Sequence, residues 1–167
     1  MKSPLLPYLC LAVVIVLSAL AGKARAQEDP GKAKLGQLQV TVYFATDGDP
    51  QVAGERAEEV ADSIRERLQK ESRLNFLHYR TLGADKQPIF RSYENWAQPL
   101  KPSDEILVRF EARSQPSGDT VSLDVELWVS KKKILKTDAR LQDGRPLFVL
   151  GPEWRGGRLI ISVALAP

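Results

Sequence analysis

Alternating apolar and polar residues in two segments, 106–113 and 121–129, constrain the fold more than any other feature of this sequence. A two-residue period is typical of a strand that has one face against a hydrophobic core and the other in water. Segments rich in β-favouring residues recur along the rest of the chain and are separated by turn residues. We therefore expect further strands at 38–44, 74–82, 87–93, 135–141, 147–150 and 159–165.

The charges on the two alternating segments favour one register between them. We expect Phe110 to lie opposite Leu123 in an antiparallel pair. This register places Arg109 opposite Asp124, whereas a shift of two residues would place Glu111 opposite an acid.

The connections between the strands follow from their turn residues. Gly83 to Lys86 predict a turn, so 74–82 and 87–93 are expected to form a hairpin. Residues 94–103 have no period and predict a long surface connection, and 151–157 predict a loop rich in glycine.

The last two expected strands differ from the others in composition. Residues 147–150 and 159–165 are apolar at nearly every position. Strands of this kind are usually covered on both faces, so we expect both to lie centrally in the sheet. Turns at 131–133 and 143–144 connect the preceding strands in a meander.

One amphipathic helix is expected near the N-terminal end, from Asp49 to about Glu71. Asp49 is a candidate N-cap and Pro50 suits the first turn. A narrow apolar stripe recurs at helical spacing, formed by Ala57, Val60, Ala61, Ile64 and Leu68. The sequence thus predicts an α+β domain over 37–167, in which a mostly antiparallel sheet or sandwich of about seven or eight strands carries this helix.

Residues 1–26 have the pattern of a cleaved signal peptide. Lys2 is followed by an apolar run, and Ala24-Arg25-Ala26 matches a signal-peptidase site. The run is too short for a typical bilayer span, although an uncleaved anchor remains the alternative. We expect export to a bacterial periplasm or cell envelope, with residues 27–36 as a flexible leader.

Removing this segment makes the chain electrically neutral. Three of the 24 basic residues lie in it, and the remaining 21 equal the 21 acidic residues. Nucleic acid is therefore not expected as a partner.

Few side chains are available for catalysis or for metal binding. Cys10 is the only cysteine and lies in the signal segment, and His78 is the only histidine. We expect His78 to be partly buried in a strand, and Asp124 and Glu126 to form structural salt bridges. No cofactor, metal site or catalytic residue is predicted, and a small hydrolase using Asp124, Glu126 or His78 is a distant alternative.

Several large aromatic side chains are candidates for contact with a ligand or partner. They are Tyr93, Trp96, Trp128 and Trp154, with Arg155 beside the last of them. Such rings suit a protein surface or a sugar, although they can equally cover the ends of a sheet.

The leading hypothesis is a non-enzymatic interaction module that binds another envelope protein through the loops that carry these aromatic residues or through an exposed sheet edge. Carbohydrate binding by Trp96, Trp128 and Trp154 is the alternative. The sequence leaves the oligomeric state open.

Overall fold

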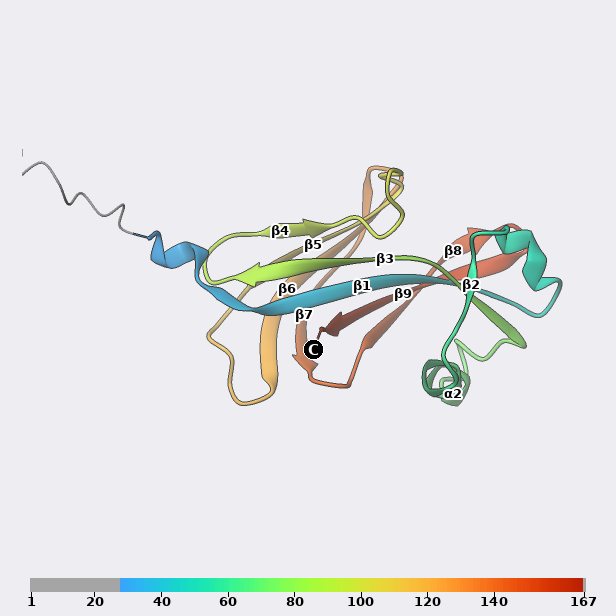
Figure 1. Ribbon diagram of the computed structural model, residues 1–167, viewed down its shortest axis with the longest axis horizontal. Coiled ribbons are helices and arrows are strands. Elements are labelled where there is room, and N and C mark those ends of the chain that lie inside the picture. The colour runs from blue at the N-terminus through green and yellow to red at the C-terminus, as the bar shows by residue number, and fades with distance from the viewer. Residues whose placement is uncertain (1–27, 167) are drawn as a thin grey trace, which may run out of the picture.

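The computed structural model of the protein describes residues 28–166, which form an elongated body built of two sheets (Figure 1). The predicted signal segment 1–26 and Cys10 lie outside the described residues. None of the helices within 28–166 is long and apolar enough to cross a membrane. Every strand pair in the two sheets is antiparallel, so the expected antiparallel sandwich is confirmed in this coarse form.

The larger sheet has five strands and the smaller sheet has four. The larger has the order β2-β3-β1-β9-β8, and the smaller the order β4-β5-β6-β7. The strands of the larger sheet are β1 (Lys34–Thr46), β2 (Glu58–Glu59), β3 (His78–Phe90), β8 (Leu147–Trp154) and β9 (Gly157–Leu165). Those of the smaller sheet are β4 (Asn95–Ala97), β5 (Ile106–Ala112), β6 (Thr120–Val129) and β7 (Lys132–Gln142).

One hydrophobic core fills the space between the sheets. It collects the inward-facing residues of both, as the alternation predicts. Burial of these side chains is the main favourable term in the stability of the fold. The largest fully buried members are Leu38, Ile89, Ile106, Phe110, Leu123, Leu127, Leu141 and Ile161.

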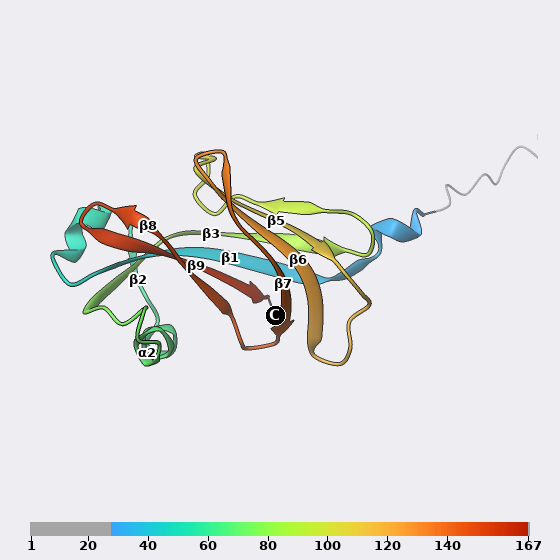
Figure 2. The same ribbon diagram turned by 180° about the vertical axis from the view of Figure 1, so that it is seen from behind.

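A second hydrophobic cluster lies on the other face of the larger sheet, beneath helix α2 (Asp62–Lys70). Leu68 of α2 is fully buried in the same cluster as Tyr43 of β1 and Ile160 of β9. At the same end of the molecule, the 3-10 helix η2 (Pro50–Ala53) lies on the opposite side of the sheet (Figures 1 and 2).

The expectation of one long helix from Asp49 to Glu71 is wrong. The carboxylate of Asp49 accepts a hydrogen bond from the Gln51 N–H at 2.9 Å, but it caps only η2. Gly54, with φ of +97°, ends η2, and a turn at Glu55 and Arg56 then leads into the short extended strand β2. The only α-helix among the described residues is the nine-residue α2, so the molecule is largely β and carries no long helix near its N-terminal end.

The expected hairpin around Gly83 is also wrong, because β3 is one continuous strand. Gly83 lies opposite Val42 and Asp85 opposite Val40, so the predicted turn residues continue the pairing with β1. Strand β1 is 13 residues long and offers a partner along the whole of β3. The strand does not turn back at this point. A bulge between Val42 and Tyr43 shifts the register of the β1–β3 pair.

Two connections are shorter than the sequence predicts. The expected surface connection 94–103 contains β4, in which Trp96 lies opposite Arg109 of β5. The expected loop 151–157 is reduced to a two-residue turn, because Arg155 and Gly156 have φ of +49° and +76° and join β8 directly to β9. Strand β9 is central as expected, whereas β8 lies at the edge of its sheet.

The segment expected to be a flexible leader, 27–36, is ordered in the part that the structure describes. The 3-10 helix η1 (Pro30–Lys32) precedes β1, which begins at Lys34. The Asp29 carboxylate accepts hydrogen bonds from the Tyr93 hydroxyl at 2.6 Å and from the Gly31 N–H at 2.8 Å. These contacts hold the start of the described chain against the β3–β4 connection.

Candidate functional site

The free edge of β8 contains the longest uncharged stretch of any edge strand in the two described sheets. Among the described strands β8 pairs only with β9, so the other side of its backbone is unpaired. Pro146 and Pro152 bracket a stretch without any charge, formed by Leu147, Phe148, Val149, Leu150 and Gly151. An edge of this kind can pair with another extended chain.

The corresponding edge of the smaller sheet, β7, is protected by its charges. Lys132, Lys133, Lys136, Asp138 and Arg140 all lie on β7. Charged side chains, lysine above all, make edge-to-edge pairing unfavourable. The other two edge strands, β2 and β4, are only two and three residues long, so β8 offers the longest edge segment without such charges.

A groove of about 410 Å³ runs beside β8 on the face of the sheet that carries α2. Its apolar wall is formed by Leu74, Pro146, Phe148 and Leu150, and its rim carries Glu71 and Arg73. Leu150 is 36% exposed, although it is a large apolar side chain in a strand. We call the uncharged stretch 147–151 and this cavity together the β8 groove, which can accept apolar side chains from an added strand.

The sequence pattern did not predict that β8 is an edge strand, and the reason is physical. One face of β8 packs against the main core through Leu147 and Val149, and the other reaches the groove through Phe148 and Leu150. The result is an uninterrupted apolar run that resembles a strand covered on both faces. The two flanking prolines were the available signal, because proline in a strand is largely confined to edges and bulges.

Trp154 and Arg155, two of the predicted contact residues, close one end of the sandwich. The Trp154 ring is half-buried and meets Phe44 edge-on, with ring centroids 5.4 Å apart. The Arg155 guanidinium lies 4.4 Å from the centre of the Trp154 ring and donates to the Val52 carbonyl at 2.9 Å. Both side chains are therefore engaged within the fold.

Trp96 and Trp128 lie together at another place, on the outer face of the smaller sheet. Their ring centroids are 6.0 Å apart and their planes are inclined by 53°. Trp96 Nε1 donates to Glu94 at 3.4 Å, and Trp128 Nε1 donates to Glu126 at 3.1 Å. The three tryptophans thus do not share one surface. Tyr93, the remaining predicted contact residue, donates its hydroxyl hydrogen bond to Asp29 in the N-terminal segment.

An ion-pair network surrounds Asp124 and Glu126 on the same outer face. Arg109 contacts Glu94, and its guanidinium also lies 3.7 Å from Asp124 and 3.8 Å from Glu126. Lys136 of β7 lies 3.2 Å from Asp124 and 3.4 Å from Glu126. The expectation that the two carboxylates form structural salt bridges is confirmed by these contacts.

The predicted register of β5 and β6 is wrong by two residues. Phe110 lies opposite Val125 and Arg109 opposite Glu126, so Glu111 does face an acid, Asp124. The like charges are tolerated because Arg109 binds Glu111 at 3.0 Å while Lys136 binds Asp124 from the other side.

The environment of Glu126 does not suit an acid catalyst. Burial raises the pKa of this carboxyl, but hydrogen bonds from Lys133, Trp128 and Lys136 lower it by more. The pKa therefore lies below its ordinary value. A general acid at neutral pH needs the opposite shift.

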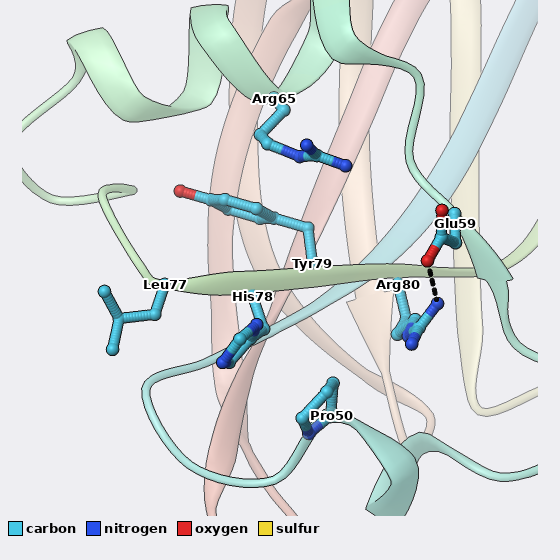
Figure 3. A pocket seen from close by; sticks show the side chains of 7 residues that line it. All are labelled: Pro50, Glu59, Arg65, Leu77, His78, Tyr79 and Arg80. Atoms are coloured by element: carbon cyan, nitrogen blue, oxygen red, sulfur yellow. Dashed lines mark hydrogen bonds and ion pairs between the residues drawn. The ribbon is translucent and has the colours of Figure 1, made fainter.

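His78 lies at a small pocket of about 180 Å³ and is exposed, so the expected partial burial is wrong. Figure 3 shows that His78 and Arg80 lie on one side of β3, whereas Tyr79 and Arg65 lie on the other. Arg80 is paired with Glu59 at 3.2 Å. The charged groups of this pocket therefore do not converge on one point.

Within residues 28–166, no group of three or more His, Cys, Asp or Glu side chains is placed to hold a metal ion. Comparisons with protein-family models, with curated proteins and with solved structures found no match to this chain.

Proposed function

We propose that the protein is an exported, non-enzymatic interaction module of the bacterial cell envelope, and that it binds another protein along β8. The observation that carries the proposal is the unpaired, uncharged edge beside an apolar groove. Export rests on the signal-peptide pattern of residues 1–26.

The bound segment would be extended and would add a sixth strand to the larger sheet. Its backbone would bond to β8, and every second side chain would face the groove, because side chains alternate along a strand. Leu74, Phe148 and Leu150 would favour apolar side chains at those positions. The proposed partner segment is therefore short and apolar at alternate residues.

The alternative functions have less support from the described residues. A carbohydrate site built from three tryptophans would need Trp154 beside Trp96 and Trp128, but Trp154 packs on Phe44 elsewhere. A hydrolase using Asp124 and Glu126 would need a carboxyl free of cations, but both carboxylates are bound by Lys136.

Site-specific cross-linking in the native host tests the proposal. Cys10 is the only cysteine, so a mature Leu150→Cys variant carries a single site for a photoactivated cross-linker. The matched control is Ile134→Cys, which replaces an apolar residue that is 50% exposed on the other sheet. We expect Leu150→Cys, and not the control, to capture one defined segment of another protein.

A synthetic peptide of the captured segment then provides the decisive measurement. We expect it to slow hydrogen exchange of those amides between residues 147 and 151 that point away from β9 in the unmodified protein, because strand addition pairs these amides. Equal capture at both positions, or unchanged exchange along β8, would contradict the proposal.

A further inference from the structure

The uncharged stretch of β8 is complementary to itself when two copies run antiparallel. A two-fold axis at Val149 would place Phe148 of each copy opposite Leu150 of the other. These two residues share the groove face of the strand, because they are two positions apart. The pairing would therefore join the two apolar grooves into one continuous surface and cover both copies of Leu150.

The charges at the ends of β8 favour the same antiparallel arrangement. Arg145 is exposed just before the strand, and Glu153 near its far end lies 3.3 Å from Arg158 of its own chain but has a side chain that is 83% exposed. Antiparallel pairing brings Arg145 of each copy toward Glu153 of the other. Parallel pairing would instead bring like charges together at both ends.

From this complementarity we propose that, when no other partner is bound, two copies of the protein pair antiparallel through β8. The inference rests on the proposed function, because it assigns a second occupant to the same edge. Pro146 and Pro152 limit the paired stretch to five residues, so the contact is small and the dimer forms reversibly. Self-pairing and binding of another protein then exclude each other, and a partner must compete with the second copy.

Sedimentation velocity over a range of protein concentrations tests the pairing, with charge-reversal variants. Arg145→Glu and Glu153→Arg should each weaken the dimer about tenfold or more, since each reversal creates two repulsive pairs across the axis. The double variant Arg145→Glu/Glu153→Arg restores opposite charges, so its dimer should return to near the original strength. Arg91→Glu, an exposed reversal in the β3–β4 connection, is the control and should leave the dimer unchanged.

Two outcomes would overturn the inference: a monomer at every concentration, or a dimer whose strength does not respond to the reversals and their combination. Failure here is distinguishable from failure of the proposed function. A monomeric protein whose β8 amides are still protected by the captured peptide would remove self-pairing and leave partner binding in place. A dimer through β8 with no captured segment would remove partner binding and leave self-pairing in place.

Discussion

Gly83 shows how one residue can be misjudged when the rest of the fold is hidden. Glycine within a strand pattern often marks a turn, but it also marks places where another backbone approaches closely. At Gly83 the second reason applies, because an added Cβ would clash with the carbonyl oxygen of Pro99. The loop that follows β4 lies directly on β3 at this point.

Replacing Gly83 by alanine should therefore destabilise the protein. We expect the free energy of unfolding to fall by about 1–3 kcal/mol, because the loop or the strand must move to admit the methyl group. Gly48→Ala is the control, since its Cβ would lie 3.5 Å from the nearest atom, Thr46 Oγ1, at ordinary contact distance. Urea unfolding of both variants is the measurement, and equal stabilities would show that the close approach is absent.

For the aromatic residues, sequence position was informative about location but not about neighbours. Sequence position indicated that Tyr93, Trp96 and Trp154 would lie in or beside connections. It could not indicate which tertiary neighbour each ring would meet. That depends on Asp29, Trp128 and Phe44, which are distant in the sequence.

At the scale of the strand, the β5–β6 register shows the limit of pairwise charge rules. The rule considered only two strands, whereas the third, β7, supplies Lys133 and Lys136. Arg109 is also long enough to reach acids on its own strand, on β6 and in the connection just before β4. The network as a whole, rather than one facing pair, determines which register is stable.

Arg109 should therefore contribute far more to stability than a surface arginine does. We expect Arg109→Met to lower the free energy of unfolding by about 2–3 kcal/mol, because it leaves the largely buried carboxylates of Asp124 and Glu126 short of a cation. Asp124 depends especially on nearby cations, since its buried Oδ1 atom makes no hydrogen bond within the described residues.

Arg113→Met is the matched control for this measurement. Arg113 binds Asp138 at 3.0 Å, but their side chains are 55% and 73% exposed. Removing such a pair costs about 1 kcal/mol or less. Similar losses for the two variants in urea unfolding would mean that the network around Arg109 adds nothing to stability.

The alternation of apolar residues correctly predicted that most of the chain forms strands in a sandwich, and it placed the turns near Lys131 and Gly144. It could not give the strand order, because a period identifies the buried face and not the neighbour. The apolar stripe at helical spacing predicted one helix from Asp49 to about Glu71, but only Asp62–Lys70 is α-helical, and Val60 is buried just after β2. The β8 edge was missed for the same reason, since an apolar run does not show what lies beside it.

At the scale of the whole molecule, Asp85 ties the two sheets together. It lies in β3, and its carboxylate accepts hydrogen bonds from the Gln98 N–H and from Lys101 Nζ, both at 2.8 Å, in the β4–β5 connection. Burial raises the pKa of Asp85, but these bonds and one from Gln87 lower it more. The pKa in the folded protein therefore lies below the ordinary value of 3.8.

This shift predicts how stability depends on pH. A carboxyl with a lowered folded pKa stabilises the protein fully above its unfolded pKa, and the contribution is lost as the pH falls through the folded value. We expect the free energy of unfolding of the original protein to fall as the pH drops below about 4. In Asp85→Asn the protein should be less stable at pH 7, and the fall on acidification should be shallower. Urea titrations at several pH values measure this, and parallel curves for the two proteins would refute it.

The anchoring of Asp29 by Tyr93 also determines how the molecule would sit on a solid support. The described chain starts at the end of the long axis opposite α2 (Figure 1), whereas Val163 near the end of β9 lies beside Leu147 at the start of β8. Immobilisation through the N-terminal side would leave the edge of β8 facing outward. A bulky fusion after β9 would crowd that edge, so affinity capture should use the N-terminal attachment.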